Sequence, residues 1–288
     1  MKNLNYLLKQ LCERNRDGSH STQAGRARLL SQIGSSLRSL GFRHMKIDSL
    51  KPKHVDSCVR HMTAQGFTPG TMKNHMSAIR WWAEKIGKPN VVARDNSFYK
   101  IPDRQYVTNE SKAVQLTNEN LEKIADRHVQ MSLILQSQFG LRREESMKIN
   151  PSLAVQGDRC VLKASWCKGG RGRSIPIRTQ AQRNALESAK QLAGRGSLIP
   201  PERTYKEHLR IFEKQTKAAG ISHTHGLRHE YAQTRYEELT GWKCPAAGGT
   251  RFKELTDEQK LTDSAARIII SNELGHSREE VTAVYLGR

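Results

Sequence analysis

The sequence predicts a mainly α protein with a helical N-terminal domain over residues 1–90 and a mixed, mostly helical domain with a small antiparallel sheet over residues 117–288. Three observations lead to this fold class. The 288 residues exceed the usual size of one domain. Apolar residues recur at intervals of three and four along most of the chain, which is the spacing of amphipathic helices. Only residues 159–166 and 173–177 read as strands, and a glycine-rich turn joins them.

Basic residues outnumber acidic ones in both predicted domains. The chain has 48 Lys and Arg against 28 Asp and Glu, a net charge of +20. Residues 1–117 contain 20 basic and 8 acidic side chains, and residues 118–288 contain 28 and 20. A polyanion is the natural partner of such a chain, and we expect it to be nucleic acid. The alternative is a generally basic, soluble surface without a specific ligand.

The cysteines and the hydropathy indicate the compartment. The five cysteines are scattered, none forms a CxxC pair, and no His/Cys cluster has the spacing of a zinc site. This usage fits a reducing cytosol. No apolar run reaches membrane length, and polar residues interrupt the N-terminus, unlike in a signal peptide. We therefore expect a cytoplasmic protein with no membrane partner.

Four helices are predicted within the first domain. They span about residues 4–11, 21–40, 48–66 and 68–87. Stripes of Leu, Ile, Val and Met give each of them an apolar face. Ser21 or Thr22 can cap the second helix, and Thr68 followed by Pro69 can begin the fourth.

The outer faces of these helices are basic, which suits a phosphate backbone. The candidate DNA contacts of this domain are Arg26, Arg28, Lys73 and Arg80. Trp81 and Trp82 are predicted to lie in the core and at its rim rather than to stack on bases. Residues 91–116 lose the periodicity and contain many loop formers, so we interpret them as an interdomain linker that crosses a DNA duplex.

The second domain begins with helical sequence. Helix signals cover residues 118–139, stop at Gly140 and resume over residues 141–149. Arg142 and Glu145 are three residues apart in this last stretch, so the carboxylate can orient the guanidinium. An ordinary helical salt bridge would have the same spacing.

A basic turn with the sequence CKGGRGR joins the two predicted strands. Lys168 would project from this turn, and Arg171 and Arg173 are further candidate DNA contacts. A glycine-rich basic turn can approach a phosphate closely, but it can equally be a solvated hairpin.

Two more helices, over about residues 180–192 and 205–219, precede the stretch SHTHGLRHEYA. His225, Arg228 and His229 would share one face of the helix that follows. The N-terminal end of that helix would place His225 where an anion is favoured. A basic helix start with ordinary polar histidines is the alternative.

The last motif reads LGHSREEVTAVY. Ser277 and Glu280 form a capping box, which predicts a helix that begins at Ser277. Val281, Val284 and Tyr285 would then share one face of this helix, and the histidine of LGH would precede the cap. Taken alone, Tyr285 reads as a core aromatic residue at helical spacing.

Taken in order, these motifs resemble those of the tyrosine recombinase, or phage integrase, family. The matching set is GLRREE with Arg142, the KGG turn with Lys168, HGLRH with His225 and Arg228, and LGH with Tyr285. The set extends over the second domain, and the basic helical domain before it resembles the family's core-binding domain. Each motif is weak alone, and their common order and spacing carry the resemblance.

The resemblance implies DNA strand transfer through a covalent protein–DNA link, with no metal, ATP or other cofactor. Tyr285 would attack a phosphodiester, form a 3′-phosphotyrosyl link and release a 5′-hydroxyl. The implied roles are phosphate binding for Arg142, Arg228 and His276, leaving-group protonation for Lys168, proton transfer at Tyr285 for His225, and support for Glu145 and His229. These residue types suit the chemistry, because a phenol with a pKa of about 10 needs help to ionise and phosphoryl transfer rewards rigid, permanently charged donors.

We therefore predict a site-specific recombinase or integrase, encoded by a bacterium or phage and associated with the nucleoid. Its partners would be double-stranded DNA, further copies of the chain in a tetrameric synapse, and accessory DNA-bending proteins. A type IB topoisomerase shares the implied chemistry and is one alternative. A DNA-binding protein that has lost catalysis is the other.

Three features depart from the family pattern. Phe139 stands where a threonine is common, and the stretch between His229 and Leu274 is longer than usual. Its extra part, residues 240–262, is interpreted either as a surface element that contacts DNA or a neighbouring protomer, or as a tolerated insertion. Only three residues follow Tyr285, whereas relatives often dock a longer C-terminal segment on a neighbour.

Overall fold

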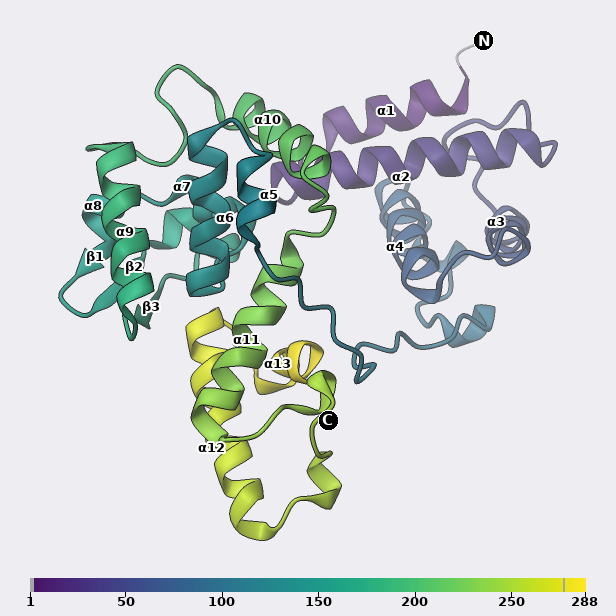
Figure 1. Ribbon diagram of the computed structural model, residues 1–288. Helices are drawn as coiled ribbons and strands as arrows, with labels where there is room; N and C mark the ends of the chain where they lie inside the picture. The colour runs from purple at the N-terminus through teal and green to yellow at the C-terminus, as the bar shows by residue number, and fades with distance from the viewer. Residues whose placement is uncertain (1–2, 277) are drawn as a thin grey trace. The chain divides into compact units, whose positions relative to one another are not determined.

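The chain forms two compact units in the computed structural model, which describes residues 3–276 and 278–288. The first unit ends at Gln105 and the second begins at Tyr106 (Figure 1). The division falls inside the stretch 91–116 that the sequence suggested as a linker. Each unit has its own hydrophobic core and is described by itself below.

Four helices build the first unit. They are α1 (Leu4–Arg14), α2 (His20–Ser39), α3 (Pro52–Ala64) and α4 (Pro69–Lys85). The hydroxyl of Thr68 caps α4 as predicted, by accepting a hydrogen bond from the amide of Thr71. The expected cap of α2 was wrong, because Ser19 takes that place and accepts a hydrogen bond from Thr22. The third helix is shorter than expected and begins at Pro52, whose ring suits the first turn.

The core of this unit contains both tryptophans. Trp82 is fully buried, and its indole donates a hydrogen bond to the carbonyl of Ile47 at 2.9 Å. Trp81 is 9% exposed and lies beneath the guanidinium of Arg26. Val92 and Ile101 pack into the same core, so the first part of the stretch 91–116 belongs to this unit.

The second unit is mostly helical with one small sheet. Its helices are α5 (Asn118–Glu122), α6 (Arg127–Phe139), α7 (Arg143–Lys148), α8 (Pro151–Ala154), α9 (Gln180–Ala193), α10 (Tyr205–Ala218), α11 (His225–Thr240), α12 (Asp257–Leu274) and α13 (Glu279–Leu286). Its strands are β1 (Val155–Gln156), β2 (Arg159–Leu162) and β3 (Arg173–Pro176), which pair antiparallel in the order β1-β2-β3. The predicted fold class is confirmed.

Several boundaries differ from the sequence-based prediction. The helix expected over residues 118–139 is two helices, because Asp126 caps a new helix with hydrogen bonds to two backbone amides. Strand β2 ends at Leu162, and short 3₁₀ turns at Ala164–Trp166 and Lys168–Gly170 follow it. Within the extra stretch 240–262, a 3₁₀ turn, Phe252–Glu254, precedes the beginning of α12 at Asp257.

The last helix also differs in its start and in its buried face. Helix α13 begins at Glu279, and the predicted cap Ser277 lies outside the described residues. Val281 is 42% exposed, although it has the same helical spacing as the buried Tyr285. The buried residues of α13 are Thr282, Ala283, Tyr285 and Leu286.

Helices α11, α12 and α13 form one part of the second unit (Figure 1). Tyr236, Ile270, Tyr285 and Leu286 are buried together in its core. Cys244, from the turn after α11, is fully buried in the same cluster. None of the described helices has the length and apolar character needed to span a membrane.

Candidate active site

Tyr285 lies at the centre of a cluster of charged and aromatic side chains. It is only 6% exposed, and its hydroxyl is 3.1 Å from Nε2 of His225 and 3.3 Å from Nε of Arg228. The ring of His229 lies 4.5 Å from the tyrosine ring, and the ring of His276 stacks on it at 5.4 Å. Helix α11 supplies three of these partners because positions 225, 228 and 229 share one face.

Arg228 connects several of the motifs. Its side chain is fully buried, and its guanidinium donates hydrogen bonds to the carbonyls of Gly140 and Leu274. One of its terminal nitrogens is 3.1 Å from Nε2 of His276. Burial lowers the pKa of Arg228 to about 10, with the charge of Arg142 acting in the same direction. The group therefore keeps its positive charge at neutral pH and fixes the end of α12 against α11.

Glu145 orients Arg142, as the spacing in the sequence suggested. The carboxylate accepts hydrogen bonds from the backbone amide of Arg142 at 2.8 Å and from its guanidinium at 2.7 Å. Burial alone would raise the pKa of this carboxyl, but the hydrogen bonds and charge of Arg173, and then those of Arg142, lower it to about 2. The side chain of Arg142 remains 26% exposed, so one part of its guanidinium reaches the surface.

The histidines around Tyr285 are uncharged at neutral pH. Loss of surrounding water lowers the pKa of His276 to about 3, and the nearby charges of Arg228 and Arg142 contribute. Loss of water and then the neighbouring His225 lower the pKa of His229 to about 4. The pKa of His225 is lowered too, by loss of water and then by Arg228 and Arg142. A neutral His225 has one unprotonated ring nitrogen, which can take a proton.

Lys168 is not part of this cluster. It lies exposed on the turn between β2 and β3, where Gly169 and Gly170 have φ angles of +75° and +67° that favour glycine. In the described part of the chain, no hydrogen bond or ion pair joins its ammonium group to the cluster.

The candidate DNA contacts fall into two groups. Arg28 and Arg171 are exposed. Arg26 pairs with Asp17, Lys73 pairs with Asp103 at 2.6 Å, and Arg80 binds the carbonyl of Ala93 and the side chain of Asn96. These three cations stabilise the first unit in this structure.

Arg173 requires a correction. Its side chain is only 4% exposed and donates to both carboxylate oxygens of Glu145, at 3.0 and 2.7 Å. The expectation that Arg173 contacts DNA conflicts with this burial. Its place at the start of a strand gave no sign of the ion pair, because Glu145 is distant in the sequence.

The sequence interpretation missed the residues that hold the helix of Tyr285. The side chain of Gln233 donates to the backbone carbonyl of Tyr285 at 3.1 Å and accepts from the hydroxyl of Ser111 at 2.9 Å. Thr282 lies 3.1 Å from Nδ1 of His276 and so helps to orient that ring. Gln233 follows His229 by four residues on α11, and this spacing is the signal that could have found it.

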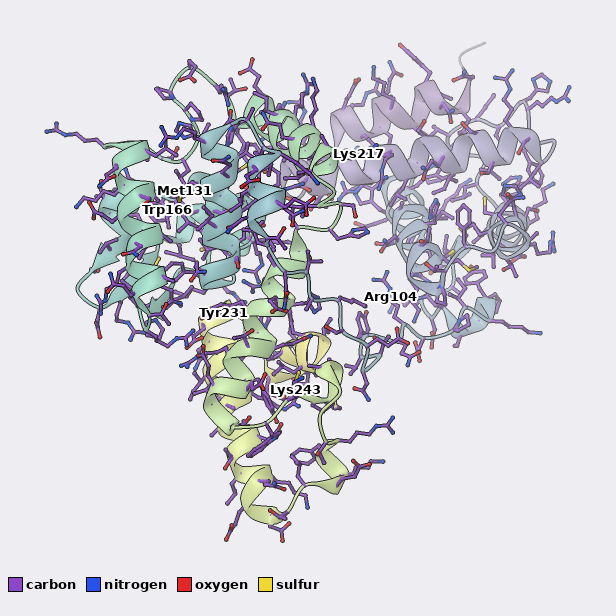
Figure 2. All side chains as sticks on the ribbon, in the orientation of Figure 1. Arg104, Met131, Trp166, Lys217, Tyr231 and Lys243 are labelled. Carbon is purple, nitrogen blue, oxygen red and sulfur yellow. The ribbon has the colours of Figure 1, made fainter. Side chains whose placement is uncertain are left out.

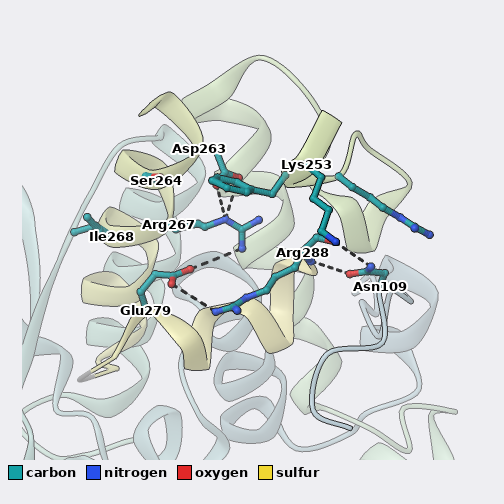
Figure 3. A pocket seen from close by; sticks show the side chains of 10 residues that line it. Asn109, Lys253, Asp263, Ser264, Arg267, Ile268, Glu279 and Arg288 are labelled. Atoms are coloured by element: carbon teal, nitrogen blue, oxygen red, sulfur yellow. Dashed lines mark hydrogen bonds and ion pairs between the residues drawn. The ribbon is translucent and has the colours of Figure 1, made fainter. Parts of the chain in front are cut away.

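The end of the chain is held in a similar way (Figure 3). Asn109 donates to the carbonyl of Arg288 at 3.0 Å and accepts from its amide at 2.8 Å. Arg267 donates to the carbonyl of Gly287 at 2.9 Å. Asn109, Arg267 and Arg288 line a cavity of about 720 Å³, together with Glu279 of α13, further residues of α12 and the turn before α12.

The other tyrosines of the second unit have different environments. Tyr231, labelled in Figure 2, donates its hydroxyl to Glu273 at 2.7 Å, and Tyr236 donates to Asp263 at 2.6 Å. Burial and these carboxylates raise the pKa of both phenols. Both hydroxyl groups are therefore poor nucleophiles, in contrast to that of Tyr285, which has a histidine and an arginine as partners.

Two protein-family models match the chain. The family described as "Phage integrase, N-terminal" matches residues 1–92, and the family described as "Integrase" matches residues 100–234. The chain belongs to the tyrosine recombinase (phage integrase) family. The resemblance seen in the sequence motifs is thereby confirmed. No curated protein matches the sequence of this recombinase.

Solved structures of integrases and recombinases share the fold. A lambda integrase dimer bound to a COC′ core site is 16% identical and covers 100% of this chain and 79% of that chain, with a TM-score of 0.63. The XerH site-specific recombinase bound to a palindromic difH substrate, in a post-cleavage complex, is 15% identical, with coverage of 98% and 80% and a TM-score of 0.60. The Tn1549 transposon integrase in complex with transposon right end DNA is 16% identical, with coverage of 100% and 95% and a TM-score of 0.56. At these identities the similarity concerns the fold.

Proposed function

We propose that this recombinase cuts and rejoins specific DNA sites through a covalent link to Tyr285. The observation that carries this proposal is the contact of the Tyr285 hydroxyl with both His225 and Arg228 in a buried, positively charged site. A phenol needs a proton acceptor and a positive charge to become a nucleophile. The two partners supply one of each.

In the proposed cleavage step, side chains of this chain accept and donate each proton that moves. His225 takes the proton of the Tyr285 hydroxyl, and the phenolic oxygen attacks phosphorus. The bond to the 5′-oxygen breaks, and Lys168 protonates this leaving oxygen. A 3′-phosphotyrosyl link and a free 5′-hydroxyl result, and attack by the hydroxyl of an incoming strand reverses the step.

The phosphate meets fixed positive charge in this site. Arg142 offers its exposed edge, and its charge acts on the whole cluster, because it lowers the pKa of both His225 and His276. We propose that His276 also donates a hydrogen bond to the phosphate, which requires its N–H on Nε2, with Nδ1 accepting from the hydroxyl of Thr282 and Nε2 released from Arg228. Nε of Arg228 donates a hydrogen bond to the phenolic oxygen of Tyr285. We expect a phosphate oxygen of the DNA to accept this hydrogen bond instead, while the phenol turns toward phosphorus.

These side chains supply the charge that a metal ion provides in other phosphoryl transfers. We therefore propose that the reaction needs neither a metal ion nor ATP. Cleavage that continues in excess EDTA and without nucleotide supports this part, and a requirement for either one contradicts it.

The partner is double-stranded DNA, and the two basic units suit it. We propose that the protomers assemble as a tetramer on two DNA sites, as recombination requires two duplexes, with accessory DNA-bending proteins as further partners. Two similar structures are a lambda integrase tetramer bound to a Holliday junction and a lambda integrase dimer bound to a COC′ core site. The protein would act on DNA in the nucleoid of a bacterium.

A pool of nicked duplexes with randomised sequence tests the function. A nick near the scissile phosphate lets a short strand escape after cleavage, so the covalent adduct accumulates. We expect a denaturation-resistant adduct with the wild type and with the control Tyr205→Phe, and none with Tyr285→Phe. An adduct that persists in Tyr285→Phe would place the nucleophile elsewhere.

Sequencing of the captured DNA separates the remaining alternatives. A shared sequence motif in the adducts supports a site-specific recombinase. Adducts without sequence preference, together with relaxation of any supercoiled plasmid, would indicate a type IB topoisomerase. DNA binding without an adduct would indicate a protein that has lost catalysis.

A further inference from the structure

Arg173 is a buried arginine that joins three separate parts of the second unit. It is the first residue of β3, directly opposite Leu162 of β2. Its Nε donates to the carbonyl of Glu273, near the end of α12, at 2.8 Å. The aliphatic part of its side chain passes over Gly275, because a Cβ added at Gly275 would lie 2.7 Å from Cδ of Arg173. The guanidinium is therefore held in one orientation before it meets Glu145.

Arg173 completes the hydrogen bonding of Glu145. Each carboxylate oxygen accepts one hydrogen bond from Arg173 and one from Arg142. A carboxylate has about four acceptor positions, so these contacts saturate the group. Two parallel hydrogen bonds to both oxygens fix the plane of the carboxylate, which a single donor cannot do.

The same contact determines how much charge Arg142 presents. Glu145 is fully buried between the two guanidinium groups, so its negative charge is shared by both. With Arg142 alone as partner, the carboxylate would neutralise it. With Arg173 present, the group of three keeps a net positive charge beside the surface that Arg142 reaches.

We propose that Arg173 is a positioning residue for the strand transfer, which acts through Glu145 on Arg142. This inference rests on the proposed function of the site. Arg173 fixes the carboxylate, the carboxylate fixes the Arg142 guanidinium, and the pair leaves the Arg142 charge available to a phosphate. Its role is not contact with DNA.

Two variants of Arg173 and one matched control test the proposal. Arg173→Gln removes the positive charge and the pair of parallel N–H donors. Arg173→Lys keeps the charge but cannot donate two parallel hydrogen bonds to Glu145. Arg159→Ala removes an exposed arginine from the neighbouring strand of the same sheet. Each variant is compared with the wild type in thermal unfolding, DNA affinity and single-turnover cleavage of the nicked duplexes captured by the wild type.

We expect slower cleavage at saturating DNA with unchanged DNA affinity. Arg173→Gln should lose about a hundredfold in rate, which is the usual effect of one preorganised donor on a developing charge. Arg173→Lys should lie between this variant and the wild type, and Arg159→Ala should cleave as the wild type does. If Arg173→Gln does not fold, Arg173→Lys carries the test, because it retains the buried positive charge.

A duplex with sulfur in place of the leaving 5′-oxygen shows whether Arg173 acts through Arg142 or through the turn that carries Lys168. A thiol is a good leaving group and hardly needs protonation, so this substrate compensates for a missing acid. We expect no recovery of the Arg173 variants with sulfur, because their defect lies in Arg142. Recovery would place the effect in the turn of Lys168 and overturn the proposal, as would a folded Arg173→Lys variant that cleaves like Arg159→Ala. A wild type that forms no adduct would instead contradict the function itself.

Discussion

Replacing Glu145 with glutamine should cost a large part of the stability of the second unit. The carboxyl is fully buried and its pKa falls from 4.5 to about 2, mainly through Arg173 and against the effect of burial. Each unit of pKa corresponds to about 1.4 kcal/mol, so the ionised form contributes about 3 kcal/mol to folding at neutral pH. Glu145→Gln removes this charge and leaves two guanidinium groups facing a neutral amide.

The pH dependence of this loss has a definite sign. The pKa of Glu145 in the folded state lies below that in the unfolded state. Its stabilisation is therefore complete above a pH of about 4.5 and is lost as the pH falls toward about 2. The difference in stability between wild type and Glu145→Gln should be about 3 kcal/mol at pH 7 and less than about half of that at pH 3.

Hydrogen exchange measured by mass spectrometry can follow this difference in the second unit alone. Peptides from α6 and α7 report the opening free energy around Glu145, separately from residues 3–105. Glu144→Gln is the matched control, because Glu144 directly precedes Glu145 on the same helix and its ion pair with Lys148 is only half-buried. The reasoning is refuted if both variants lose the same stability at pH 7, or if the Glu145→Gln difference stays constant down to pH 3.

Three further predictions concern protons and positioning. His276 and His229, with pKa values lowered to about 3 and about 4, should remain neutral at pH 5.5 in histidine NMR spectra, whereas a histidine near its ordinary value of about 6.5 should be charged. Lys168→Ala should slow cleavage by about a hundredfold or more, and sulfur in the leaving position should restore it, because the variant lacks only the acid; no recovery would make Lys168 a phosphate or base contact. Asn109→Ala should lower the rate of adduct formation with unchanged DNA affinity, because it removes both hydrogen bonds that hold the backbone of Arg288, three residues after Tyr285. An unchanged rate would show that the Arg288 contact is dispensable.

The periodicity of the sequence was sufficient to predict the fold class and most helices. Helix positions depend on local signals such as Thr68 before Pro69, and these were read correctly. The predicted helix boundaries that were wrong depend on which of several neighbouring polar residues caps the helix. Ser19 rather than Ser21 caps α2, and Asp126 interrupts a stretch whose apolar spacing looked continuous.

The site was predictable only in part. Motif order pointed to Arg142, His225, Arg228 and Tyr285, and the structure places His225 and Arg228 within hydrogen-bond distance of the Tyr285 hydroxyl. The position of Arg173 could not be predicted, because its burial depends on a glutamate in another helix and on the end of α12. Such contacts arise from tertiary packing, which periodicity and spacing do not encode.

The stretch 240–262 contains two parts that should respond differently to substitution. Its first part enters the core: Cys244 is fully buried, Ala246 is 7% exposed, and an added Cβ at Gly287 would lie 2.8 Å from the amide of Ala246. The interpretation of the whole stretch as a replaceable surface loop therefore needs revision. Its second part, around the exposed residues 250–254, fits that interpretation.

Ala246→Asp and Thr250→Asp separate these two parts, because they introduce the same charge at a buried and at an exposed position that are only four residues apart in the sequence. A carboxylate at position 246 would be buried without a partner, and we expect a loss of about 3 kcal/mol or more. Because Ala246 packs in the same cluster as Tyr285 and Leu286, adduct formation should fail as well. Thr250→Asp lies at an exposed position and should leave folding unchanged. Equal stability of the two variants in thermal unfolding would show that the turn at Ala246 does not support the helix of Tyr285.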